Sequence, residues 1–167
     1  MKLEVLVLSS EIWSAQGSIG RVLVFRLPPG TDMMDAIREQ VEAAGFKSAV
    51  VLGGAASLKS AVLRNVKSFP RQWPITDENR QYTPVEGPLE LLALSGNLAR
   101  NPDGSFMVHL HATVSGTDGT VRGGHVVKGA IILSTAEIAV AELTGMVLTR
   151  SFNDETKVYE LKPEREE

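Results

Sequence analysis

Short runs of aliphatic and β-branched residues, many of them alternating with polar residues, recur along most of this sequence. Such runs are typical of β-strands that bury one face. The pattern predicts strands in LEVLVLS, GRVLVFRL, LELLALSGNLAR, SFMVHLHATVS, GMVLTRSF and KVYELK, and two strands around a Gly-Gly turn in KSAVVLGGAASLKSAVLRNV. TVRGGHVVKGAIILS is predicted to be a further strand or pair. TAEIAVAEL fits the apolar period of a helix or of a strand, and we favour a strand because its neighbours are strands.

One segment, PPGTDMMDAIREQVEAAGF, changes to a helical period. Thr31 or Asp32 is suited to cap the first turn, and Gly45 is suited to end the helix. The apolar residues between them fall on one face: Met34, Ile37, Val41 and Ala44. The sequence therefore predicts one helix against a sheet.

The fold class that follows is α+β, a single domain over residues 1–167 with a large, mostly antiparallel sheet and one or two packed helices. Residues 65–88, rich in proline and polar residues, are predicted to form a long loop that acts as a lid or an oligomer contact. Trp73 and Tyr82 in this loop either cover a ligand or clamp onto apolar surface. Residues 162–167 are predicted to be a solvated tail.

Composition narrows the classes of function. A net charge of −3, with scattered basic residues, gives no field that would attract nucleic acid or an anionic membrane. The chain has no cysteine, which excludes disulfides, thiolate metal sites and cysteine nucleophiles. No apolar stretch reaches the length of a membrane span. We therefore expect a cytoplasmic protein without direct nucleic-acid or membrane binding.

All three histidines of the chain lie between His109 and His125. Strand alternation in SFMVHLHATVS gives one wholly apolar face and places His109 and His111 together on the other, about 7 Å apart along the strand. The turn at Asp118-Gly119 returns the chain, so that His125 can reach the pair. Gly123 and Gly124 beside it leave room for a ligand or another subunit.

Three neutral imidazoles suit a zinc ion, since catalytic zinc commonly has three protein ligands and an open fourth position. Copper, nickel, iron and manganese also accept imidazole, so the residues do not fix the metal. A His-x-His pair also occurs on exposed strands without any metal, and that alternative stays open. Glu90 and Glu137 lie among apolar neighbours and are candidate catalytic acids or bases. Their alternative is a surface position or an ion pair.

The segments GRVLVFRLPPGTDMMDAI, GPLELLALSGNLAR and HLHATVSGTDGTVRGGHVVKGAIILSTAEI follow one another in order. In combination they resemble the plant and prokaryote conserved (PPC) domain over about residues 21–143. The resemblance implies a compact α+β fold that assembles as a homotrimer and has no established activity in prokaryotes. In plants the domain follows a DNA-binding AT-hook, an element that this sequence lacks. The family fold is also similar to that of acetolactate decarboxylases, whose zinc is held by a His-x-His pair and a downstream histidine. His109, His111 and His125 match that pattern in kind.

Three functions remain open on this basis. The first is a trimeric PPC-domain protein with a three-histidine zinc site and a small-molecule ligand or protein partner. The second is a zinc-dependent lyase or hydrolase that acts on a small carboxylic acid. The third is a trimeric interaction or regulatory module without catalysis, in which the histidines are structural. The sequence does not decide whether the protein is an enzyme.

Overall fold

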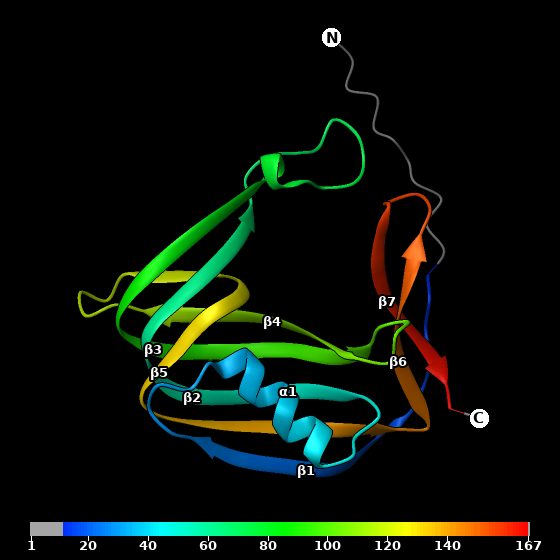
Figure 1. The fold of residues 1–167 in the computed structure, drawn as a ribbon, viewed down its shortest axis with the longest axis horizontal. Coiled ribbons are helices and arrows are strands. Elements are labelled where there is room, and N and C mark those ends of the chain that lie inside the picture. Colours follow the sequence, from blue (N-terminus) through cyan, green and yellow to red (C-terminus); the bar gives the residue numbers. More distant parts are fainter. Residues whose placement is uncertain (1–11, 167) are drawn as a thin grey trace.

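Strands make up most of the described chain, as the sequence pattern predicts (Figure 1). The computed structural model describes residues 12–166. The strand predicted for LEVLVLS lies outside these residues. The elements are β1 (Ser18–Leu27), α1 (Met33–Ala43), β2 (Ala49–Val66), a 3₁₀ turn η1 (Asp77–Asn79), β3 (Arg80–Arg100), β4 (Phe106–Ser115), β5 (Val121–Thr144), β6 (Met146–Asn153) and β7 (Val158–Arg165).

The strands form one sheet in the order β1-β5-β2-β3-β6-β7, and β4 pairs with both β3 and β5. Because β2 also pairs with β3 and β5, these four strands close a ring of pairings. All of the strand pairs are antiparallel except the single parallel bridge between Arg100 and Thr149. The mostly antiparallel sheet with one packed α-helix is thus confirmed in the described residues. The ring matters for function because it brings the end of β2 beside β4 and the start of β5.

The predicted helix is confirmed as α1. Asp32 is its N-cap, and one carboxylate oxygen accepts hydrogen bonds from the backbone N–H groups of Met34 and Asp35 at 3.0 and 3.3 Å. The other oxygen accepts from the N–H of Gly129 at 2.8 Å, which ties the helix to β5. The apolar face packs on the sheet because Met33, Ala36, Ile37 and Val41 are buried.

The predicted Gly-Gly turn in KSAVVLGGAASLKSAVLRNV is wrong, because β2 runs through it as a single strand of 18 residues. The register to β5 shifts between Val51 and Gly53, so the glycines lie at a bulge. A Cβ at Gly54 would lie 2.6 Å from the side chain of Ile138 and 2.8 Å from the carbonyl oxygen of Glu137. Glycine is needed there for the close approach of β5 and not for a chain reversal.

The predicted loop over residues 65–88 is too long. Only residues 67–79 lie between β2 and β3, and residues 80–88 belong to β3 although they include Pro84 and Pro88. Pro88 lies where the register to β2 shifts, and in residues 80–88 the other edge of β3 carries no described partner, which are the settings in which strands tolerate proline. No helix in residues 12–166 is long and apolar enough to cross a membrane.

The predicted solvated tail, residues 162–167, is also corrected. β7 continues to Arg165, and Lys47 forms an ion pair with Glu166 at 2.6 Å. The second carboxylate oxygen of Glu166 accepts a hydrogen bond from the N–H of Gly145. The end of the described chain is therefore held against the sheet.

Candidate metal centre

The pairing of β4 with β5, and of β5 with β2, brings the three histidines together. His111 lies directly opposite His125 across β4 and β5, and His125 lies opposite Arg64 across β5 and β2. Directly opposed residues of antiparallel strands project from the same face. His109 follows on that face, two residues from His111 and opposite Asn97. All three histidines therefore come from one chain and face the same space.

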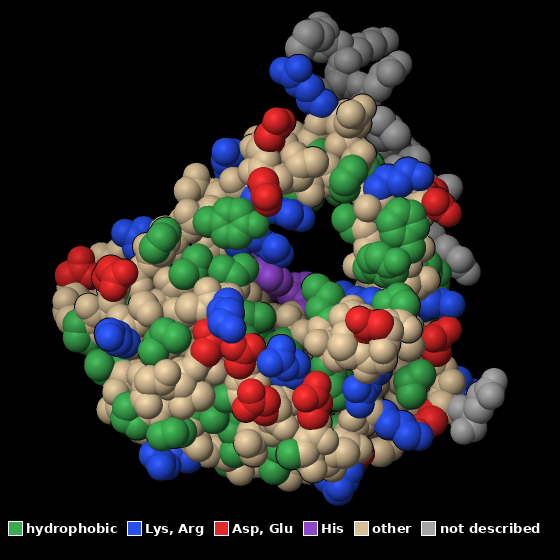
Figure 2. Space-filling view, in the orientation of Figure 1, with side chains coloured by type: hydrophobic (Ala, Val, Ile, Leu, Met, Phe, Trp, Pro, Cys, Tyr) green, Lys and Arg blue, Asp and Glu red, His purple; other side chains and the backbone are tan. Residues whose placement is uncertain are grey.

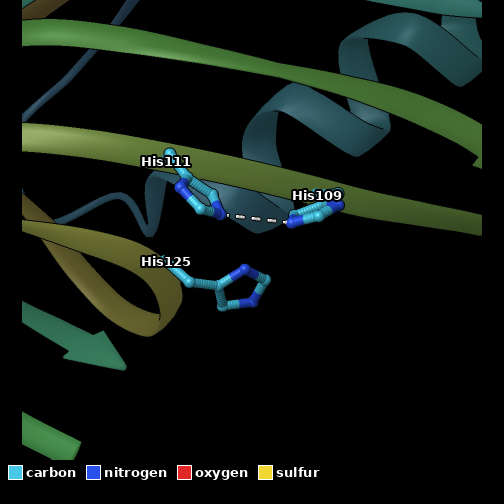
Figure 3. A group of neighbouring side chains, drawn as sticks. All are labelled: His109, His111 and His125. Carbon is cyan, nitrogen blue, oxygen red and sulfur yellow. Dashed lines mark hydrogen bonds between the residues drawn. The ribbon is translucent and has the colours of Figure 1, made fainter. Parts of the chain in front are cut away.

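The three imidazoles converge closely (Figure 3). One ring nitrogen from each lies within 4.8 Å of the others, and the Nε2 atoms of His109 and His111 are 3.3 Å apart. The ring centroids are 4.9 to 5.5 Å apart. In Figure 3 the His125 ring extends from β5 toward the space that the β4 pair faces. The expected proximity of His125 to the pair is confirmed.

The opposite face of β4 is the apolar face that alternation predicts. Phe106, Leu110, Ala112 and Val114 are buried, and Val108 packs against the core. The space expected beside the two glycines of β5 is partly filled by Asn65. Its side chain donates to the carbonyl of Gly123 at 3.1 Å, and a Cβ on Gly124 would lie 2.7 Å from its amide oxygen. These glycines thus let β2 approach the start of β5.

The surroundings favour neutral imidazoles. Burial, followed by the positive charge of Arg64, lowers the pKa of His125 from 6.5 to about 4. Burial, followed by the charge of Arg150, also lowers the pKa of His109. A neutral imidazole has a free lone pair for a metal, so protons compete weakly for these two ligands near neutral pH.

A cavity of about 400 Å³ opens over the histidines. In Figure 2 the histidine side chains lie at the floor of an opening, with Lys or Arg side chains beside them. Trp73 from the loop and Val158 from β7 contribute apolar wall, as expected for Trp73 if the loop covers a ligand. The full lining is Arg64, Asn65, Val66, Trp73, Ile75, Arg80, His109, His111, His125 and Val158.

Glu90 and Glu137, the candidate acids or bases, are not brought to this cavity. Both are exposed, and neither belongs to its lining. Glu90 lies opposite Ser115, four residues beyond His111 along β4, and Glu137 lies opposite Arg26 and Ala55. A catalytic role for either glutamate stays a prediction to which its position lends no support.

The structure adds three arginines that the sequence analysis did not single out. Arg64 and Arg80 line the cavity, and Arg150 acts on His109 from β6. These residues are far from the histidines in sequence, and only strand pairing brings them together. An early signal existed for Arg64 alone, as a cation at the end of a strand beside the predicted loop.

Comparison with known proteins places this geometry in context. The model of the Plants and Prokaryotes Conserved (PCC) domain matches residues 14–144. A plant- and prokaryote-conserved protein from Pyrococcus horikoshii has a similar structure, with a TM-score of 0.72 and 27% identity, covering 89% of this chain and 97% of that one. A metal-containing protein from Archaeoglobus fulgidus is similar at a TM-score of 0.72 and 25% identity, covering 91% and 99%.

Two further matches are more limited. α-Acetolactate decarboxylase from Bacillus subtilis is similar in fold alone, with a TM-score of 0.51 and 13% identity over 72% of this chain and 51% of that one. The bifunctional protein GlmU of a Synechococcus strain is 34% identical over 87% of this chain. This chain spans only 21% of that protein's length, so the match concerns one part of it.

Proposed function

Since this chain belongs to the family of the Plants and Prokaryotes Conserved domain, we propose that it is a metal-binding member in which His109, His111 and His125 hold one zinc ion. The observation that carries the proposal is the convergence of three ring nitrogens within 4.8 Å. Zinc–nitrogen bonds of about 2.0–2.1 Å at tetrahedral angles separate ligand nitrogens by about 3.3–3.4 Å. The 3.3 Å between the Nε2 atoms of His109 and His111 fits that spacing.

A metal-free account explains less of the geometry. A hydrogen bond between His109 and His111 satisfies one nitrogen of each ring. It gives no reason for His125 to approach, because the His125 imidazole makes no hydrogen bond within residues 12–166. The metal-containing relative from Archaeoglobus supports a metal in this family. Zinc is our first choice because three histidines with an open fourth position are a common ligand set of catalytic zinc, and the elemental analysis below identifies the metal among those that accept imidazole.

The decisive experiment is elemental analysis of protein purified without a histidine tag. We expect about one zinc per chain in the wild type and none in the double variant His109→Ala, His111→Ala. Thr113→Val, on the same face of β4 but outside the cluster, is the matched control and should keep its metal. Absence of metal from the wild type, with no uptake on zinc titration, would exclude the site and favour an interaction module with structural histidines.

We also propose that the chain assembles as a homotrimer, as the family resemblance implies. The edge strand β1 supports an assembly because Ile19, Val22 and Val24 are 61%, 55% and 70% exposed. In residues 12–166 this strand pairs only with β5, so its other edge carries free backbone groups. Contact of these apolar side chains with another copy of the chain would remove them from water.

A zinc-dependent lyase or hydrolase acting on a small carboxylic acid is the second candidate. The cavity over the three histidines favours it, because a small ligand in that cavity would lie beside a metal ion held by the histidines. In such a position zinc acts as a Lewis acid on an oxygen of the ligand. A screen of small esters, lactones and 2-keto acids, with and without chelator, tests this function. Turnover that persists after metal removal would contradict it.

A further inference from the structure

The wall of the cavity over the three histidines carries two positive side chains. Arg64 lies opposite His125 in the β2–β5 register, and Arg80 lies opposite Val66, two residues further along β2. Alternation therefore puts both guanidinium groups on the face that holds the histidines. Both arginines line the cavity together with the three histidines.

These charges are poorly compensated. Arg64 forms no ion pair with any residue of the described chain. Arg80 contacts Asp77 at 3.2 Å, but the side chain of Asp77 is 79% exposed, so water screens the pair. Among residues 12–166, no aspartate or glutamate lines the cavity. The imidazoles also make no hydrogen bond to a carboxylate in residues 12–166, although such partners commonly accompany metal-bound histidines.

A third cation, Arg150, lies beside His109 outside the cavity lining. Arg150 is only 7% exposed, and its Nη2 donates to the side-chain oxygen of Asn97 at 3.1 Å. Its Nε has no hydrogen-bond partner in the described structure. Asn97 lies opposite His109, so this buried guanidinium adds positive charge to the same site. Buried charge without a counter-charge is costly, and a divalent ion would add to that cost.

We propose that this cavity binds a small organic anion, a carboxylate or phosphate whose oxygens lie between Arg64, Arg80 and the metal ion. A guanidinium group donates two parallel hydrogen bonds to either oxyanion. The remaining wall is apolar, with Val66, Trp73, Ile75 and Val158, and accommodates an apolar body on the anion. A volume of about 400 Å³ is within the range for small-molecule sites. The proposal deepens the proposed function and rests on its metal site for the metal–oxygen contact.

Benzoate and phenyl phosphate are suitable probes, and benzamide is the neutral control of the same shape as benzoate. Calorimetric titration is done on full-length protein, both zinc-loaded and chelator-treated, with the metal content of each sample measured. We expect one of the two anions to bind well and benzamide to bind at least about tenfold more weakly, because it lacks the charge. The preferred anion then identifies the acid group of the natural ligand.

Arg64→Gln and Arg80→Gln should each weaken anion binding about tenfold or more, after circular dichroism confirms the fold. Arg165→Gln is the matched control, because it removes the same charge from an exposed position on β7 that is not part of the cavity. Arg64→Gln should also bind zinc more tightly than the wild type, because a repelling cation beside His125 is gone. If Arg64 had a purely structural role, its replacement would weaken the binding of both the anion and zinc.

The outcomes separate the two proposals. If the protein takes up zinc but binds neither anion, the anion site is overturned and the metal site remains. The same holds if benzamide binds as tightly as benzoate, or if neither arginine variant weakens anion binding. Arginine-dependent anion binding by protein that takes up no zinc keeps the anion site and removes the metal. Arginine-dependent binding that strengthens on zinc loading supports both.

Discussion

The surroundings of His125 determine whether its imidazole carries a proton or is free to bind a metal. His125 lies between His111 on β4 and Arg64 on β2, so it has another imidazole on one side and a cation on the other. Both the neighbouring charge and burial disfavour its protonated form. A neutral ring in that position is suited to accept a metal and unsuited to carry a proton.

Replacement of His125 should mainly lower the affinity of the protein for zinc. In His125→Gln, two imidazoles remain on β4, and we expect zinc affinity to fall by about 100-fold or more, since a lost metal–nitrogen bond exceeds the 10–100-fold typical of changes to supporting partners. Competition with a chromophoric chelator measures the change. Thr113→Val should match the wild type. Equal affinity of His125→Gln and wild type would show that His125 is no ligand.

The pKa of His125 also predicts how the metal-free protein responds to acid. The folded state takes up this proton only near pH 4, whereas the unfolded chain takes it up near the ordinary value of 6.5. The unfolded state thus binds more protons between these values, and stability present above pH 6.5 is lost as the pH falls toward 4. His109, whose pKa is also lowered, contributes in the same direction.

Thermal unfolding of chelator-treated protein at pH 7.5 and pH 5 tests this dependence. The wild type should lose more of its melting temperature over that interval than His125→Gln, by about 3 °C or more. Carboxylates with lowered pKa values, such as Asp35 and Glu142, are common to both proteins and cancel in the comparison. Parallel pH profiles for the two proteins would contradict the assignment.

At the scale of elements, Asp32 couples helix α1 to the sheet. One of its carboxylate oxygens caps the helix, and the other accepts from Gly129 on β5. Asp32→Ala removes both interactions and should lower the free energy of unfolding by about 2 kcal/mol, above the typical loss of a cap alone. Urea denaturation measures the loss. Asp32→Asn keeps a capping oxygen and should lie between; a wild-type value for Asp32→Ala would exclude the coupling.

Features set by local chemistry were predictable from the sequence. The cap at Asp32 and the end of the helix follow from side-chain hydrogen bonding, and the two faces of β4 follow from strand alternation. Because the turn at Asp118-Gly119 is short, the reach of His125 to the pair also followed from local geometry. The histidine part of the site was therefore accessible without a structure.

Features that depend on distant strands were not predictable. Gly53 and Gly54 have the composition of a turn, and only the approach of Ile138 on β5 makes them a bulge. The prolines of residues 80–88 suggest a loop, but they lie in a strand that has an unpaired edge there and a register shift at Pro88, and neither feature is visible in the sequence. The same reasoning applies to Arg64 and Arg150, whose role depends on pairings across the whole sheet.

At the scale of the whole molecule, the histidine cavity is lined by residues inside and outside the region that the family model matches. The floor is β4 and β5, within the region that the family model matches, whereas Val158 of β7 lies beyond residue 144. The loop of residues 67–79 supplies Trp73 and Ile75. The three histidines and the loop of residues 67–79 thus lie within the region that the family model matches, and only the wall contributed by the β6–β7 hairpin lies beyond it.

The proposed homotrimer can be tested with a substitution on β1. Val22 and Val24 project outward from an edge strand, while Leu23, Phe25 and Leu27 between and beyond them pack on the core. Val24→Asp places a charge on the outward face, so it should break an assembly there while the core contacts persist. Light scattering should give about three times the 18.0 kDa of one chain for the wild type and one chain for the variant.

Gln40→Glu is the matched control for this variant, because it adds the same charge at an exposed position on α1. It should remain trimeric. A monomeric wild type would remove the assembly altogether, and a trimeric Val24→Asp protein would move the interface away from β1. Zinc content measured on the monomeric variant has a definite expectation as well: because all three histidines of each site come from one chain, the separated subunits should keep their metal.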